Sequence, residues 1–365
     1  MTEPIHIDVA IIGGGILGLG LAYELTKAKP HLNLALFEKG LFFAEHTSTR
    51  NSGVLHAGIY YPTGSLKHRF CILGNQLWDL WRQDLDIPVT RTGKYILASS
   101  PNEYSQLDQL FELAKKNCVE EIRPASSKEL AKLKSISHVV SALYSPDSGI
   151  IDVSGAIKKL ETALFKKEVP LLKDHFISQL KKTADGFSFY TGSDEIQCSI
   201  LVNAAGLWAP QVRSQLGLTN LTSHFVKGNY LRYQSPIDTK HLLYPIPPQD
   251  LQGLGVHLTF NHQNEFRFGP DTEVVDDVDY ALSNNIHSKM RPSIDRLFKN
   301  IDHSKITEDY CGIRPKIKSK GTLYSDFWIG NQQVHGIKNY YEFCGIESPG
   351  LTSAPALARW VVDQI

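Results

Sequence analysis

A glycine-rich turn near the N-terminus constrains this chain most strongly. The β-branched run Asp8–Ile12 leads directly into the sequence G-G-G-I-L-G at residues 13–18, so a G-x-G-x-x-G pattern stands between a strand and a helix. In such a turn the first glycine permits a tight bend, the second lets the backbone approach a pyrophosphate, and the third lets the helix pack closely on the strand. The pattern therefore predicts a βαβ unit that binds a dinucleotide.

The residues after this turn indicate which dinucleotide binds. A helix is expected from Leu19 to Lys27, and its N-terminus offers free N–H groups and a positive dipole end to the phosphates. A second strand, from Asn33 to Phe37, ends at Glu38. A carboxylate at this place suits the hydroxyls of an adenosine ribose, so the pattern favours NAD or FAD over NADP.

Composition limits the kinds of protein that this chain can be. Its 365 residues, of which 42% are apolar and 21% charged, are typical of a globular protein with about two domains. Lys plus Arg equal Asp plus Glu at 38 each, which argues against a nucleic-acid partner. The five cysteines have no C-x-x-C spacing and the histidines form no metal motif, so we expect a reducing compartment and no metal site.

Insertion into a membrane is not expected. No stretch reaches the ~18 uninterrupted apolar residues of a spanning helix, and the N-terminus lacks a basic signal region. These features predict a cytoplasmic protein, and they leave peripheral contact with the inner membrane open.

Three later segments have the composition of contacts to the same ligand. Residues 41–62 mix small, polar and histidine residues without a helical or strand period, and long irregular segments in compact domains are usually functional. A buried strand at 200–203 is followed by small residues at 204–206, where a ligand can approach the backbone closely. Residues 340–363 run from a strand through a glycine-bearing turn into a helix, which predicts a second helix N-terminus facing the ligand.

The order of these segments predicts domains that are interleaved along the chain. The expected fold class is α/β (α+β), with a Rossmann-type dinucleotide-binding domain interleaved with a smaller β-rich substrate domain. We expect the dinucleotide-binding domain to comprise residues 1–88, 145–215 and 318–365. The substrate domain is expected to comprise residues 89–144 and 216–317.

Several separated motifs together resemble a known family. The glycine-rich start, Glu38, the sequence N-A-A-G-L-W at 203–208 and the terminal turn are similar to those of FAD-dependent oxidoreductases of the D-amino-acid oxidase and glycine oxidase type. Within that superfamily, N-S-G-V-L-H-A-G-I-Y-Y-P at 51–62 resembles the L-2-hydroxyglutarate dehydrogenase or oxidase branch. Further matches are S-L-K at 65–67, G-I-I-D at 149–152, Y-P-I-P at 244–247, G-V-H-L-T at 255–259 and G-I-R-P-K at 312–316.

The resemblance implies an FAD-binding domain with noncovalent FAD, and it implies which residues hold the cofactor. The pyrophosphate is expected at residues 13–18, the ribose at Glu38, and the flavin ring between residues 47–56 and 348–352. N–H groups at the start of the last helix would stabilise negative charge on the reduced flavin. The expected cofactor contacts are Gly13, Gly15, Ile16, Gly18, Glu38, Lys39, Thr47, Ser48, Asn51, Ser52, Phe176, Ala205, Gly206, Ser348, Gly350, Leu351 and Thr352.

Oxidation of a 2-hydroxy acid requires a cation for the carboxylate, a base for the hydroxyl proton and a hydride acceptor. Arg314 is the expected carboxylate clamp, because a guanidinium pairs bidentately with a carboxylate. His257 and His56 are the candidate bases; we favour His257 as base, with His56 positioning flavin or substrate. Further candidates, for the distal carboxylate of a diacid, are Tyr60, Tyr244 and Lys227.

The expected reaction is oxidation of L-2-hydroxyglutarate, or a close 2-hydroxy acid, to the 2-oxo acid. Electrons would pass to a quinone, to another acceptor or to oxygen. Two alternatives stay open: an amino-acid or amine oxidase of the glycine oxidase type, and a flavin-bound protein with a binding or redox-sensing role. Replacing His257 and His56 separates a 2-hydroxy-acid oxidase from an amine oxidase, because an amine reacts in its neutral form and needs an active-site base less.

Overall fold

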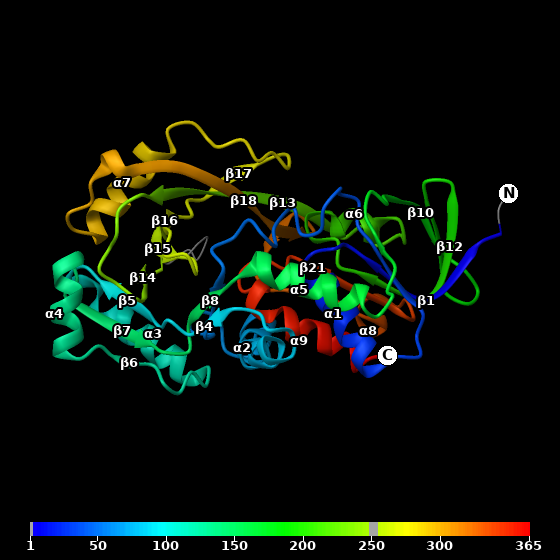
Figure 1. The fold of residues 1–365 in the computed structure, drawn as a ribbon, viewed down its shortest axis with the longest axis horizontal. Coiled ribbons are helices and arrows are strands. Elements are labelled where there is room, and N and C mark those ends of the chain that lie inside the picture. The colour runs from blue at the N-terminus through cyan, green and yellow to red at the C-terminus, as the bar shows by residue number, and fades with distance from the viewer. Residues whose placement is uncertain (1–2, 248–254) are drawn as a thin grey trace.

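The computed structural model describes residues 3–247 and 255–365, whose strands form two large sheets and one small sheet (Figure 1). Within these residues no helix has the length and apolar character needed to cross a bilayer. The α-helices are α1 (Ile16–Ala28), α2 (Leu66–Leu85), α3 (Tyr104–Lys116), α4 (Ser127–Ile136), α5 (Val153–Phe165), α6 (Ala209–Ser214), α7 (Ile286–Leu297), α8 (Gln332–His335) and α9 (Gly350–Val362).

The first large sheet has a parallel centre built on β1. Its strands are β1 (Ile5–Ile12), β2 (Leu34–Phe37), β9 (Leu171–Leu172), β10 (Ile177–Lys182), β11 (Phe187–Thr191), β12 (Asp194–Asn203), β20 (Trp328–Gly330) and β21 (Tyr340–Cys344). β1 pairs in parallel with both β2 and β12, and Ile12 stands level with Phe37 and Asn203. The carboxyl ends of these three strands therefore meet at one edge, where the glycine turn, Glu38 and residues 204–206 follow.

Helices cover one face of this sheet and fix the turn before α9. α9 packs against both α1 and α2. The helices approach closely at Gly74, where a methyl group would collide with the Thr352 carbonyl. Trp78 and Trp81 are fully buried in this layer, as expected for core residues, and the Trp78 indole donates to the Leu351 carbonyl at 3.0 Å.

The second large sheet carries the other half of the molecule. Its strands are β5 (Lys94–Ala98), β6 (Arg123–Pro124), β7 (Ser141–Ser145), β13 (Leu221–Tyr233), β14 (Leu242–Pro245), β15 (His257–Phe260), β16 (Phe266–Gly269), β17 (Glu273–Val275), β18 (Ile306–Ser319) and β19 (Thr322–Tyr324). β13 and β18 are the longest, pair antiparallel, and run from this half towards the first sheet (Figure 1). β19 continues the pairing with β18 past residue 317, where we expected the substrate domain to end.

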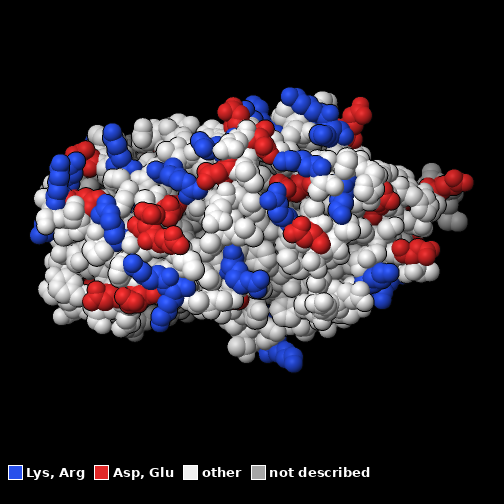
Figure 2. Space-filling model, turned by 90° about the horizontal axis from the view of Figure 1, so that it is seen from below, with Lys and Arg blue, Asp and Glu red and all other residues white. Residues whose placement is uncertain are grey.

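The third sheet is small and has three strands, in the order β3 (Val54–Leu55), β8 (Gly149–Ile151), β4 (Val89–Thr90). The predicted fold class is confirmed, because strands of the two large sheets alternate along the chain. On the face shown in Figure 2, basic and acidic side chains are interspersed, in keeping with the equal charge totals.

Candidate active site

A cavity of about 1040 Å³ begins at the carboxyl edge of the first sheet and extends to the second. Its wall includes the glycine turn and the ends of β2 and β12. The opposite wall comes from β13, β15 and β18, and the turn before α9 closes the cavity. The expected ligand-binding segments are thus brought together around one space.

The glycine turn forms a narrow cradle at the edge of the first sheet. Gly13 has a φ of +107°, and a methyl group there would collide with the Ala204 carbonyl oxygen. A methyl group at Gly15 would lie 2.9 Å from the hydroxyl oxygen of Ser48. Both positions line the cavity, so glycine is what keeps this part of it open.

The N–H groups of the turn fit a pyrophosphate. Gly14 donates to Glu38 Oε2 at 2.7 Å, and Ile16 donates to Ser48 Oγ at 3.0 Å. In contrast, the N–H groups of Gly15 and Leu17 have no acceptor within residues 3–247 and 255–365. Unpaired donors at the start of α1, beside a cradle that a side chain would fill, are what a dinucleotide phosphate requires.

Glu38 holds the turn as well as lining the cavity. Its two carboxylate oxygens accept from the N–H groups of Gly14 and Gly40, each at 2.7 Å. Each oxygen keeps a free lone pair, so a ribose hydroxyl can still donate to it. Two other expected contacts near this end, Lys39 and Phe176, also line the cavity.

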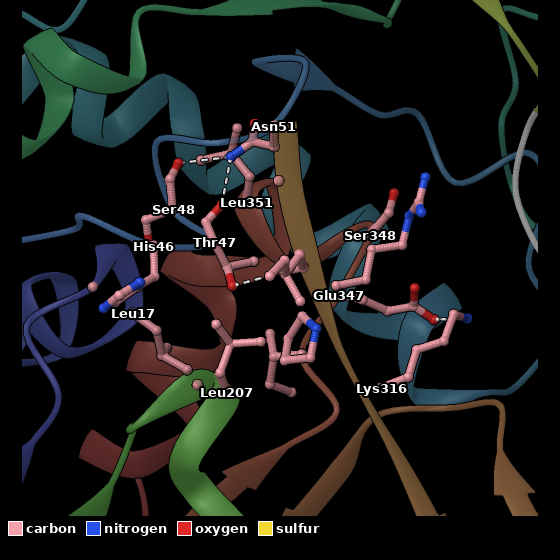
Figure 3. A pocket seen from close by; sticks show the side chains of 18 of the residues that line it. Leu17, His46, Thr47, Ser48, Asn51, Leu207, Lys316, Glu347, Ser348 and Leu351 are labelled. Atoms are coloured by element: carbon pink, nitrogen blue, oxygen red, sulfur yellow. Dashed lines mark hydrogen bonds and ion pairs between the residues drawn. The ribbon is translucent and has the colours of Figure 1, made fainter. Parts of the chain in front are cut away.

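Residues 47–52 form the middle of the cavity wall and are pinned to β18. The hydroxyl of Thr47 donates to the Ile313 carbonyl at 3.1 Å, and the Asn51 amide donates to the carbonyls of Thr47 and Ser48 (Figure 3). The hydroxyl of Ser52 lies 3.0 Å from that of Tyr230. A segment without regular secondary structure is thus held by side-chain hydrogen bonds.

The turn before α9 offers fewer free N–H groups than we expected. Gly350 lines the cavity as expected, but its N–H already donates to the Glu347 carbonyl and is not free for a ligand. Leu351 and Thr352 keep N–H groups without an acceptor in the part of the chain that the structure describes. Ser348 and Leu351 line the cavity beside them.

Two of the expected cofactor contacts, Thr352 and Gly18, lie outside the cavity wall and pack against residues of the wall. The hydroxyl of Thr352 is buried and accepts the N–H of His56 at 2.9 Å. Gly18 lets α1 pack against the Gly13 carbonyl, where a methyl group would collide. Neither residue lines the cavity, whereas Ala205 and Gly206 do.

His257 lines the cavity and has one ring nitrogen without a hydrogen-bond partner among the described residues. Its Nδ1 lies 2.8 Å from the Gly255 carbonyl oxygen, and because a carbonyl only accepts, Nδ1 carries the proton. Nε2 is therefore a lone-pair acceptor; it is buried and has no hydrogen-bond partner among the described residues. Burial lowers the pKa of His257 to about 3, and the charges of Lys94 and Arg314 act in the same direction.

His56 faces the same region from the other wall. Its Nε2 lies 3.4 Å from the Ser348 hydroxyl, and its buried Nδ1 has no partner within the described ranges. Burial holds the pKa of His56 well below its ordinary value, and Lys94 and His257 add to this effect. Both histidines are therefore neutral at physiological pH.

Arg314 is a cation without a counter-ion. Its guanidinium donates to the carbonyls of Lys227 at 3.3 Å and Asp271 at 3.1 Å, and it forms no ion pair in residues 3–247 and 255–365. A guanidinium has five N–H donors, so three remain for an anion in the cavity. Tyr60 and Tyr244 line the same end and are buried.

Lys227 does not reach the cavity, so its expected contact with substrate is wrong. Its ammonium donates to the Ala281 carbonyl at 2.8 Å and lies 3.7 Å from Asp279. Its neighbours Val226 and Gly228 line the cavity instead, because successive side chains of β13 point to opposite faces.

Two charged features of the site were not anticipated from the sequence. Lys94 is fully buried. Its Nζ has no hydrogen-bond partner in the described part of the chain and lies 4.6 Å and 4.8 Å from the ring centres of Tyr60 and Tyr244. Burial lowers its pKa to about 7. The second feature is an ion-paired group at Glu347, described below.

Among the described residues, no group of three or more His, Cys, Asp or Glu side chains is arranged to hold a metal ion.

Comparison with known proteins agrees with this geometry. A family model described as FAD dependent oxidoreductase matches residues 8–364. The mitochondrial L-2-hydroxyglutarate dehydrogenase of Arabidopsis thaliana is 30% identical, over 98% of this chain and 83% of that protein. The glycerol 3-phosphate dehydrogenase of Caloramator mitchellensis is 28% identical, over 98% of this chain and 73% of that protein.

A solved structure agrees over nearly the whole fold. The L-α-glycerophosphate oxidase of Mycoplasma pneumoniae, with FAD bound, superposes with a TM-score of 0.89 at 26% identity, covering 99% of this chain and 94% of that one. The cradle at residues 13–18 fits the pyrophosphate of the same cofactor. The chain belongs to the family of FAD-dependent oxidoreductases and is an enzyme that uses FAD.

Proposed function

We propose that this flavoenzyme oxidises L-2-hydroxyglutarate, or a close 2-hydroxy acid, to the corresponding 2-oxo acid. The observation that carries the proposal is the pairing of an uncompensated guanidinium, Arg314, with a neutral imidazole whose free nitrogen is buried, His257. These are the carboxylate clamp and the base that a 2-hydroxy acid requires. The 30% identity to an L-2-hydroxyglutarate dehydrogenase supports the same substrate class.

Arg314 binds the carboxylate next to the reacting carbon. Its two contacts to backbone carbonyls fix the plane of the guanidinium, so the remaining N–H groups are held in place for a bidentate pair. A fixed carboxylate in turn fixes the C2 hydroxyl of the substrate relative to the two histidines.

His257 takes the hydroxyl proton on Nε2. The hydrogen bond from Nδ1 to the Gly255 carbonyl keeps the ring in the tautomer that can accept, and it stabilises the imidazolium once the proton arrives. The substrate carboxylate offsets the charge of Arg314, one of the charges that oppose protonation of His257. His56 and Ser348 position the substrate or flavin from the opposite wall.

Bound FAD would supply the acceptor for the hydride that leaves C2. Loss of this hydride and of the hydroxyl proton leaves the 2-oxo acid. The burial of His56, Tyr60, Tyr244 and His257 excludes bulk water from the reacting group. Electrons then leave to a quinone, to another acceptor or to oxygen; we place the enzyme in the cytoplasm, with peripheral membrane contact if a quinone accepts them.

A second candidate substrate is sn-glycerol 3-phosphate. Its oxidation also removes a proton and a hydride from a secondary alcohol. Its phosphate is an anionic group that a cationic side chain can bind. The fold likeness to a glycerophosphate oxidase favours it, as does the 28% identity to a glycerol 3-phosphate dehydrogenase. An amino-acid oxidase of the glycine oxidase type stays the alternative, because Arg314 would bind the carboxylate of an amino acid in the same way.

Turnover with an artificial electron acceptor tests the proposal. We expect the holoenzyme to convert L-2-hydroxyglutarate to 2-oxoglutarate, identified by mass spectrometry. The acceptor should take up two electrons for each 2-oxoglutarate formed. Turnover of sn-glycerol 3-phosphate in its place would establish the second candidate. Turnover of glycine or another amino acid, with neither alcohol consumed, would replace both with an amine oxidase.

A further inference from the structure

Lys67, Lys316 and Glu347 form a charged group in the wall of the cavity. The ammonium groups of Lys67 and Lys316 both donate to Oε1 of Glu347, at 2.8 Å and 2.7 Å. Figure 3 shows Lys316 and Glu347 pointing towards each other, with Ser348 beside them. All three side chains are about nine-tenths buried, since 11% of each lysine and 9% of the glutamate are exposed.

This group carries one positive charge more than it can balance. The two ammonium groups hold the pKa of Glu347 below its ordinary value although burial opposes this, so the carboxylate is ionised. Two cations then share one anion. Each ammonium spends one of its three N–H groups on Glu347 and keeps two. A buried surplus charge with free donors is costly unless an anion meets it.

Within residues 3–247 and 255–365, neither lysine forms an ion pair with a second carboxylate. Asp326 also lines the cavity, but its oxygens accept the backbone N–H groups of Leu66 and Lys67, at 2.8 Å each. His224, opposite Lys316 on β13, has a pKa lowered by burial and by Lys318 and Lys316, and is neutral.

The group lies on the same face of β18 as Arg314. Arg314 and Lys316 are two positions apart on one strand, and both line the cavity. Their Cα atoms are thus separated by about 6.6–6.8 Å. Glu347 also directly precedes Ser348, whose hydroxyl lies 3.4 Å from His56. The cavity wall therefore carries two cationic sites along one face of β18, Arg314 and the pair Lys67 and Lys316.

We propose that Lys67 and Lys316 form a second anion subsite, so that the substrate is a dianion with acid groups at both ends. This inference rests on the proposed function for the first site, in which Arg314 binds the carboxylate next to the reacting carbon. The acid group at the second subsite is a carboxylate or a phosphate. A spacer of a few carbons joins it to the reacting end.

Binding of unreactive acids to the oxidised holoenzyme tests the subsite without turnover. Glutarate has two carboxylates and butyrate has one, and the dissociation constant of each is measured from the change in flavin absorbance and from the melting temperature. We expect glutarate to bind at least about tenfold more tightly than butyrate. Lys316→Met and Lys67→Met should each weaken glutarate about ten- to a hundredfold and leave butyrate unchanged.

A matched control lies on the same strand. Lys318 is two positions beyond Lys316 on β18 and does not line the cavity, so Lys318→Met should bind glutarate as the wild type does. Glu347→Gln removes the competing carboxylate and should keep or strengthen the preference for glutarate. FAD content and melting temperature of each variant show whether it has folded.

A parallel titration with phosphate compounds shows whether the second subsite binds a carboxylate or a phosphate. Tighter binding of sn-glycerol 3-phosphate and inorganic phosphate than of glutarate, lost in Lys316→Met, identifies a phosphate subsite. Equal binding of glutarate and butyrate, wild-type binding in both lysine variants, or no response to any of these anions overturns the subsite. If L-2-hydroxyglutarate leaves the flavin oxidised while glutarate still depends on the two lysines, the proposed function fails and the subsite stands.

Discussion

The imidazole of His257 lies flat against the ring of Tyr244, with 3.8 Å between ring centres and 14° between the planes. Tyr244 is on β14 and His257 on β15, which are neighbours in the second sheet. The stack fixes the ring plane of His257, and the bond to the Gly255 carbonyl fixes its tautomer. Nε2 is therefore presented in one orientation, as a general base requires.

Replacing His257 by Asn should remove the proposed base, Nε2, and keep a hydrogen-bond donor to the Gly255 carbonyl. The Asn amide can still donate to the Gly255 carbonyl, but no group replaces Nε2. We expect the rate of flavin reduction by L-2-hydroxyglutarate to fall about 10²–10⁴-fold. Anaerobic stopped-flow absorbance measures this rate, and His262→Asn, which lies outside the cavity wall, serves as control. A rate within twofold of wild type would remove His257 from the mechanism.

Replacing Arg314 by Lys should weaken carboxylate binding although the charge is kept. A lysine cannot reproduce the two carbonyl contacts together with a bidentate pair. We expect the dissociation constant of 2-oxoglutarate to rise about ten- to a hundredfold. Flavin difference spectra give this constant. Unchanged affinity in Arg314→Lys would mean that the carboxylate binds elsewhere.

Lys94 should make stability depend on pH. Burial lowers its pKa from 10.5 to about 7, so the unfolded chain holds a proton that the folded protein lacks between these values. The free energy of unfolding contributed by Lys94 therefore rises with pH across that interval, by up to about 1.4 kcal/mol per pH unit, and the full cost of the buried charge is present below pH 7.

Lys94→Met carries no such proton and tests this account. Relative to wild type, we expect it to be most stabilised below about pH 7 and to lose that advantage as the pH rises towards 10.5. Urea unfolding of the holoenzymes at several pH values measures the difference, and Lys318→Met should parallel the wild type. A difference between Lys94→Met and wild type that is constant with pH would contradict the lowered pKa.

Gly13→Ala should lower both the FAD content and the stability of the protein. The added methyl group faces both a positive φ and a collision with the Ala204 carbonyl oxygen. Gly64→Ala separates the two effects, because Gly64 also has a positive φ but a methyl group there would have no described atom within 4 Å. We expect Gly64→Ala to lose about 1–2 kcal/mol of stability with full FAD content. Gly13→Ala should lose more stability and purify with little FAD; full FAD content would contradict the cradle.

Local patterns were enough to predict the dinucleotide cradle. The strand, the glycines and Glu38 lie within one βαβ unit, so their spacing fixes their geometry. Arg314 and His257 were expected in the site from the residue types in their motifs, and both line the cavity, while their roles stay predictions. In each case a short stretch of chain contains the information.

The parts that could not be predicted depend on contacts between distant segments. Glu347 and Lys67 are 280 positions apart in the chain, and neither local sequence indicates that the two side chains are in contact. Lys94 resembles a lysine at the start of an exposed strand, and its burial follows from the packing of Tyr60 and Tyr244 over it. Lys227 was misassigned because the face of β13 that meets the cavity is decided by the packing of the sheet.

Anaerobic mixing of the holoenzyme with L-2-hydroxyglutarate tests the central claim most directly. Oxidation of the substrate has to bleach the flavin absorbance in a single turnover, without any second acceptor. We expect complete bleaching with one 2-oxoglutarate formed per FAD, and no bleaching with D-2-hydroxyglutarate or glycine. A flavin that stays oxidised with L-2-hydroxyglutarate, or that glycine reduces as fast, would contradict the account.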